Sequence, residues 1–204
     1  MVSDPFVRDG WVTFPYCETR AKWCSVAHHI ALGVQADQDM IKQWLQCQGT
    51  WFVGVEALAT TQTGQIKQTP LDDALLQFIA KFQLAPMPPA QLSIMYQGYP
   101  KPRDGDSAAA ALYRRDRDAA HVDGLHAIGT PKRRFLKEAH AFVLGIPLNN
   151  ADALASPMVV WEGSHHIMRA AFHAHLSNIS IKDWSTTDLT ETYLAARKTV
   201  FETC

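Results

Sequence analysis

A histidine and an aspartate two residues apart, His121 and Asp123, have the clearest potential for chemistry in this sequence. On an extended segment, residues i and i+2 point to the same face, so the sequence predicts that both side chains share one side of a strand. An imidazole nitrogen and a carboxylate oxygen can then bind one metal ion at adjacent corners. They would be two of the three ligands in the 2-His-1-carboxylate triad that suits non-haem Fe(II). The spacing alone is weak, because a loop histidine beside a turn-forming Asp-Gly pair has the same letters.

The segments that follow strengthen this interpretation. An apolar run at 141–148 predicts a buried strand, and a polar turn follows at 149–152. A second apolar run at 158–161 also predicts a strand, and it ends at Glu162-Gly163-Ser164-His165.

The pattern H-x-D-G, an apolar strand, an N-N turn and V-V-x-x-G-S-H resembles the phytanoyl-CoA dioxygenase (PhyH) family of Fe(II)/2-oxoglutarate-dependent oxygenases. The resemblance runs from about Gln91 to Ser164. It implies an α+β fold with a double-stranded β-helix (jelly-roll, cupin-like) core and flanking helices. It also implies that His121 and Asp123 hold Fe(II), that 2-oxoglutarate is the cosubstrate, and that a small organic molecule is hydroxylated.

The same resemblance implies that Gln91 and Met95 line the cosubstrate pocket, since they lie four apart on one face of an expected strand. A simple core position is the alternative for Met95.

The third metal ligand is not identified by the sequence. In the family it is a late histidine on a strand, followed by an arginine that pairs with 2-oxoglutarate, and nothing between His165 and Cys204 has that pattern. We expect the chain to be the N-terminal part of a longer protein, with a jelly-roll that is incomplete at its C-terminal end. Alternatively, the protein has lost its metal, or a nearby histidine completes the site. The candidates are His165, His166, His173 and His175. Of these, His165 is a weak candidate, because a hydrogen-bonding turn residue is its simpler role.

Length and composition describe one ordinary globular domain over residues 1–204. We expect a helical part at 1–90, jelly-roll strands at 91–164 and a helical remainder at 165–204. The net charge of −1 does not suggest a nucleic-acid partner, and no apolar stretch is long enough for a membrane span. Four cysteines without metal-site spacing suggest reduced thiols in a cytoplasmic protein. The expected partner is a small-molecule substrate, and the oligomeric state stays open.

Several further elements are expected to position the motif. Apolar spacing predicts helices at 20–32, at 37–46 and from Thr69 onward, the last with Thr69 as its N-cap and Pro70 at its first position. Other patterns predict strands at 51–55 and 91–96, and two late helices that begin at Ser164 and near Ser185.

Two other functional classes compete with the oxygenase hypothesis. One is a catalytically silent, metal-free jelly-roll binding domain, and the other is a cupin-like metal enzyme such as an isomerase or a zinc enzyme. Metal analysis and 2-oxoglutarate turnover discriminate between the three classes.

Overall fold

The computed structural model of this chain describes residues 4–82 and 86–204, which divide into two compact units. The first unit contains the N-terminal residues up to Thr13, His121–Val143 and Val159–Cys204. The second unit contains Phe14–Ala120 and Leu144–Met158. Each unit is described by itself, and the expectation of a single domain over 1–204 stays a prediction.

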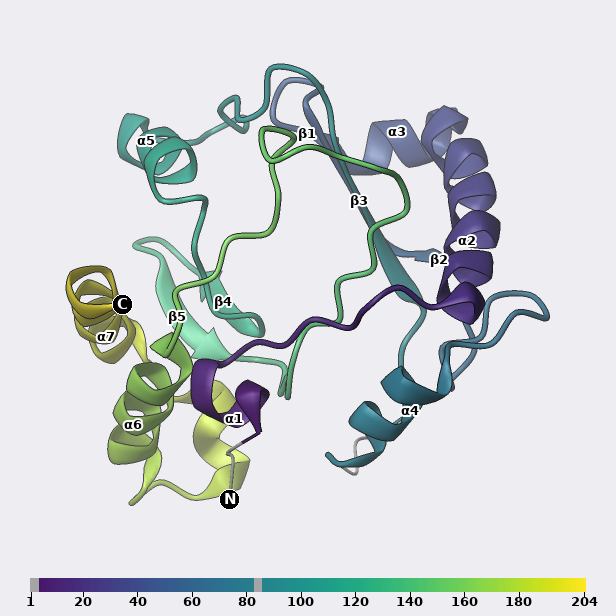
Figure 1. Cartoon of the computed structure of the whole chain (residues 1–204). Helices are drawn as coiled ribbons and strands as arrows, with labels where there is room; N and C mark the ends of the chain where they lie inside the picture. The colour runs from purple at the N-terminus through teal and green to yellow at the C-terminus, as the bar shows by residue number, and fades with distance from the viewer. Residues whose placement is uncertain (1–3, 83–85) are drawn as a thin grey trace. The chain divides into compact units, whose positions relative to one another are not determined.

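The second unit combines helices with a three-stranded antiparallel sheet in the order β1–β2–β3 (Figure 1). Its strands are β1 (Leu45–Gln46), β2 (Trp51–Leu58) and β3 (Ala90–Met95). Its helices are α2 (Glu18–Ala36), α3 (Gln38–Trp44), α4 (Asp73–Ala80) and α5 (Ala108–Asp116). The helix predicted at 20–32 and the strands predicted at 51–55 and 91–96 are confirmed. The helix predicted at 37–46 is confirmed over Gln38–Trp44, whereas Leu45–Gln46 form β1 instead.

One face of α2 packs on this sheet. Trp23, Ala27 and Ala31 recur every four residues on that face, and all three are buried. They share a core with Phe52 of β2 and Leu92 of β3. Trp23 is the largest of the three side chains, and its Nε1–H donates to the Gly64 carbonyl at 2.9 Å.

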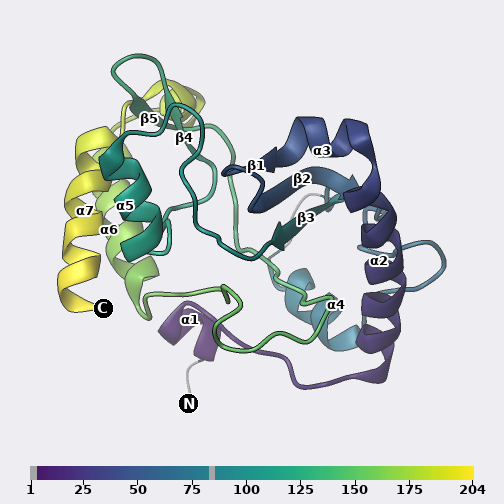
Figure 2. The same cartoon turned by 90° about the horizontal axis from the view of Figure 1, so that it is seen from above.

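The first unit consists of a β-hairpin and helices. The strands β4 (Leu125–Ile128) and β5 (Arg133–Leu136) pair antiparallel. The helices are α1 (Pro5–Asp9), α6 (Ser164–Leu176), the 3₁₀ helix η1 (Ile181–Thr186) and α7 (Thr190–Thr203). Figure 2 shows α6 and α7 running side by side. Residues of the hairpin and of this helical part share a small core, built from Leu125, Leu176, Leu189 and Tyr193.

The two late helices are present, and one of them begins later than expected. The helix predicted from Ser164 is confirmed as α6. The helix predicted near Ser185 begins at Thr190, because Ser185 lies within the 3₁₀ helix η1.

The fold is therefore mixed α/β with two small antiparallel sheets. Neither sheet closes into a barrel within residues 4–82 and 86–204. None of the helices in the described part of the chain is long and apolar enough to cross a membrane. All four cysteines are free thiols.

The strands predicted at 141–148 and 158–161 do not form. Leu144, Ile146 and Leu148 do alternate with exposed neighbours and pack on the core of the second unit. However, neither segment forms backbone pairing with a strand among the described residues. The alternation of buried and exposed side chains therefore belongs to an extended segment that is not part of a sheet. Met158 is correspondingly 70% exposed.

The helix predicted to start at Thr69 starts instead at Asp73. The backbone N–H and C=O of Thr69 both bond to Ile66 in a tight antiparallel bridge, which keeps Thr69 out of helical geometry. Asp72 caps the helix, and its Oδ1 accepts from the backbone N–H of Leu75 at 3.3 Å.

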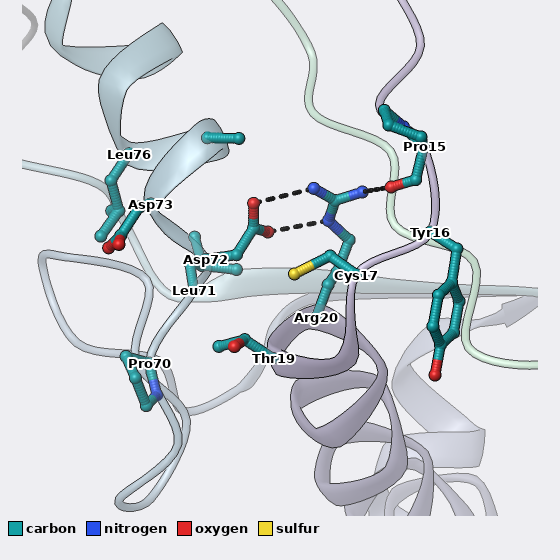
Figure 3. Close-up of a pocket in the computed structure, with 11 residues that line it drawn as sticks. Pro15, Tyr16, Cys17, Thr19, Arg20, Pro70, Leu71, Asp72, Asp73 and Leu76 are labelled. Atoms are coloured by element: carbon teal, nitrogen blue, oxygen red, sulfur yellow. Dashed lines mark hydrogen bonds and ion pairs between the residues drawn. The ribbon is translucent and has the colours of Figure 1, made fainter.

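A buried ion pair joins α2 to the start of α4. Arg20 donates from Nε and Nη2 to the two carboxylate oxygens of Asp72, both at 2.8 Å, and from Nη1 to the Pro15 carbonyl at 2.9 Å (Figure 3). The two side chains are only 14% and 4% exposed. The hydrogen bonds from Arg20 lower the pKa of Asp72, and burial acts in the opposite direction.

We expect Asp72→Asn to lower the free energy of unfolding by about 3 kcal/mol, because it leaves the Arg20 guanidinium buried and without its counter-charge. Asp73→Asn removes the same charge one residue later, from an exposed position in the first turn of α4. Its expected cost is about 0.5 kcal/mol. Urea denaturation followed by circular dichroism measures both. Equal losses in the two variants would contradict the role given to the pair.

Candidate functional site

His121 and Asp123 lie together in the first unit, just before β4. The Nε2 atom of His121 is 3.1 Å from Oδ1 of Asp123, and the two side chains are 65% and 44% exposed. The prediction that they share a strand face is wrong, because residues 121–122 have no regular structure and 123–124 form a turn. The side chains nevertheless meet, as the spacing predicted, through the turn instead of through the pleat of a strand.

Gly124 makes this turn possible. Its φ of +77° lies in the left-handed region that favours glycine. Its carbonyl accepts hydrogen bonds from the backbone N–H groups of Lys137 (2.9 Å) and Glu138 (3.3 Å). A Cβ at this position would stand 2.1 Å from the Glu138 carbonyl oxygen and 2.9 Å from the His140 ring. The Asp123–Gly124 turn is therefore held against the segment that leaves β5.

Asp123 is held in its charged form. The hydrogen bond from His121 lowers the pKa of the Asp123 carboxyl, burial opposes this effect, and the charges of His121 and His140 add to the lowering. An ionised carboxylate is the form that binds a metal ion.

A second histidine–carboxylate group lies beside this pair. The Glu138 carboxylate contacts Nε2 of His140 at 2.9 Å with one oxygen and Nε2 of His126 at 3.3 Å with the other. The hydrogen bond from His140 is the largest cause that lowers the pKa of Glu138. The sequence interpretation missed this group. His126 lies on β4 and Glu138 lies just after β5, so it is the antiparallel pairing of these two strands that brings the side chains together.

The His121–Asp123 pair fits a divalent metal ion in donor type and in spacing. Two donors bound about 2.1 Å from an octahedral metal ion stand about 3.0 Å apart, close to the observed separation. A direct hydrogen bond has the same length, so the distance suits both states. No group of three or more histidine, cysteine or acidic side chains in the described residues is arranged to hold a metal ion.

His165 has a different environment. Its Nε2 lies 3.0 Å from the Val7 carbonyl, while Nε2 of His166 lies 3.1 Å from the Arg8 carbonyl and the Gly163 N–H donates to the Asp9 carbonyl. The turn thus satisfies the carbonyls that α1 leaves open at its C-terminal end. This arrangement agrees with the simpler role of a hydrogen-bonding turn residue. His165 as a metal ligand stays a prediction.

Gln91 and Met95 both lie on β3 in the second unit, and Gln91 is exposed while Met95 is half-buried. Their assignment to a cosubstrate pocket stays a prediction.

A pocket of about 370 Å³ lies elsewhere in the second unit, between the start of α2 and the start of α4 (Figure 3). The Arg20–Asp72 pair forms part of its wall, with Cys17 and Tyr16 at its edge. Because Arg20 and Asp72 satisfy one another, this pair offers no unused charge to a ligand.

Replacing Gly124 by alanine tests the turn, and Gly129→Ala is the control. Gly129 has a similar φ of +83°, but a Cβ there would stand 3.6 Å from the Pro131 carbonyl oxygen, so we expect this variant to lower the free energy of unfolding by about 1 kcal/mol. Gly124→Ala adds the collision with Glu138 and should cost at least about 3 kcal/mol. Urea denaturation compares the two variants. A smaller loss for Gly124→Ala would show that the segment after β5 can move away freely.

A carbon-detected NMR titration tests the electrostatics of the pair. We expect the Asp123 carboxyl to titrate below its ordinary pKa of about 3.9, and His121→Gln to raise that pKa toward the ordinary value. His126→Gln, which alters the neighbouring Glu138 group, serves as the control. Since folding lowers this pKa, the stabilisation by the pair is present above the unfolded-state pKa and is lost as pH falls through the folded-state pKa. An unchanged Asp123 pKa in His121→Gln would contradict the assignment.

The chain matches no protein-family model, no curated protein and no solved structure. The functional proposal therefore depends on the motif and on the geometry described above.

Proposed function

We propose that this chain is a non-haem Fe(II)/2-oxoglutarate-dependent oxygenase that hydroxylates a small organic molecule. The observation that carries the proposal is the 3.1 Å approach of His121 Nε2 to Asp123 Oδ1 on a partly exposed turn. The pattern shared with the PhyH family supports it. The proposal includes the family's jelly-roll core.

In this proposal, His121 and Asp123 hold the metal ion as neighbouring ligands. Asp123 is already ionised, so metal binding does not have to displace a proton from it. His121 must offer Nε2 as an acceptor, which requires the neutral ring with its proton on Nδ1. Fe(II), when bound with 2-oxoglutarate and O₂, supplies oxidative decarboxylation coupled to hydroxylation of a substrate C–H bond.

The Glu138 group would support this site. The positive charge that His140 carries when protonated stabilises the Asp123 carboxylate, and the Gly124 turn fixes the Asp123 backbone against Glu138. Such surrounding contacts orient metal ligands and tune their basicity. With Asp123 as a ligand, a bound metal ion would lack the vacant position that a halide needs, so hydroxylation is favoured over halogenation.

A catalytically silent, metal-free binding domain is the second candidate. It is favoured by one observation, that the described residues contain no group of three metal-binding side chains. In that case the His121–Asp123 contact is an exposed ion pair, which typically contributes less than about 1 kcal/mol to stability.

Metal titration distinguishes the two candidates. Anaerobic Fe(II) with 2-oxoglutarate should give a weak visible charge-transfer band, and Mn(II) should show saturable binding by electron paramagnetic resonance. We expect His121→Ala and Asp123→Ala each to weaken Mn(II) binding by about 100-fold or more, as loss of a direct ligand should exceed the roughly 10–100-fold cost of removing a supporting group.

His29→Ala is the matched control, because His29 is an exposed histidine on α2 of the second unit. It should leave Mn(II) affinity unchanged. The oxygenase proposal would be rejected in favour of the metal-free domain by either of two results. One is that the unmodified chain shows no saturable Mn(II) binding, and the other is that the His121 and Asp123 variants bind Mn(II) as tightly as the unmodified chain.

A further inference from the structure

Two arginines of the second unit lie in one small cluster with unused hydrogen-bond donors. The two-arginine cluster consists of Arg103, Arg114, Asp106, Trp51 and Tyr99. The Nε atoms of Arg103 and Arg114 are buried, and neither has a hydrogen-bond partner. Buried polar groups in folded proteins are almost always paired, so two such donors in one cluster call for a physical explanation.

The cluster forms a continuous series of contacts. The Arg103 guanidinium carbon lies 4.9 Å from the centre of the Trp51 ring, and that ring lies 5.9 Å from the Tyr99 ring. Asp106 closes the series, since one of its carboxylate oxygens accepts from the backbone N–H of Arg103 and from Nη2 of Arg114, both at 2.9 Å.

The charges of the cluster do not balance. Asp106 is paired with Arg114, and these two side chains are only 16% and 11% exposed. Arg103 has no carboxylate within ion-pair distance among the described residues, although it is half-buried. Two guanidinium groups beside one carboxylate leave one uncompensated positive charge in a poorly solvated place, which is costly.

The Arg103 side chain is also well oriented for a ligand. Its guanidinium lies over the Trp51 ring, and within the described residues none of its side-chain N–H groups donates to a protein acceptor. A guanidinium that is supported by an aromatic ring still has the N–H groups of its planar edge to offer to a ligand. That edge matches the two oxygens of a carboxylate or phosphate group.

We propose that the two-arginine cluster binds an oxyanion, a carboxylate or phosphate group of a small molecule, on the guanidinium edge of Arg103. Arg114 adds attraction while Asp106 keeps Arg114 in place, and Trp51 supports the Arg103 guanidinium from one side. The bound group supplies the missing negative charge and accepts hydrogen bonds from the terminal Nη–H groups of Arg103. This proposal does not depend on the metal site, because all five residues belong to the second unit.

The test is a titration of the unmodified full chain, followed through the ¹H–¹⁵N signals of its arginine Nε–H groups. Inorganic phosphate, acetate and chloride are added separately at matched ionic strength. We expect phosphate or acetate to shift two of these signals saturably, and chloride to leave them unchanged. The stronger of the two ligands identifies the group as a phosphate ester or a carboxylate. Equal shifts with all three anions, or no saturable shift, would overturn the proposal.

Variants locate the site. Arg103→Gln should weaken binding by about tenfold or more, which is the usual effect of losing charge-assisted hydrogen bonds. Arg115→Gln removes the same charge from the same neighbourhood, but Arg115 is 63% exposed and pairs with Asp116, so its affinity should change less than about twofold. Arg103→Lys keeps the charge without the flat edge, and it should also weaken binding several-fold. Unchanged anion affinity in both Arg103 variants would show that the anion binds elsewhere. A loss of affinity in Arg115→Gln as large as that in Arg103→Gln would show that the anion responds only to the overall positive charge of this surface.

Discussion

The close approach of the Gly124 backbone to Glu138 is the constraint on which the candidate site depends. The Gly124 carbonyl receives two backbone hydrogen bonds from the far end of the hairpin, and the position has no space for a side chain. These contacts hold the turn that carries Asp123 against the residues that follow β5. The same approach explains why His140 comes near enough to Asp123 to affect its pKa. One backbone contact therefore organises both histidine–carboxylate groups.

Histidine–carboxylate contacts of this kind are compatible with two chemical states. With a proton on Nε2, His121 donates to Asp123 and the pair is a hydrogen bond. With Nε2 unprotonated, both atoms offer lone pairs to the same point, as metal ligands do. The low pKa of Asp123 favours the carboxylate in either state. Whether Nε2 of His121 carries a proton is thus the physical difference between a hydrogen-bond donor and a metal ligand.

The second unit contains two arginine–aspartate pairs that contrast in how completely they are satisfied. Arg20 and Asp72 form two hydrogen bonds to each other, and a backbone carbonyl accepts a third from Arg20. That pair is a structural link between helices. Asp106 instead receives only one side-chain bond from Arg114 and none from the Arg103 side chain. Complete pairing indicates a structural role, whereas an arginine without a carboxylate partner is a candidate for anion binding.

The sequence by itself determined the helix at 20–32, most of the helix predicted at 37–46 and the strands at 51–55 and 91–96, because their apolar periodicity and end signals are local. It also determined that His121 and Asp123 could meet, since side chains two residues apart can approach one another when the segment is not helical. Tertiary structure decided the rest. The runs at 141–148 and 158–161 have strand composition, but a strand exists only when another segment supplies hydrogen bonds. The approach of Glu138 and His140 to the motif likewise depends on the pairing of the hairpin strands, which no local pattern encodes.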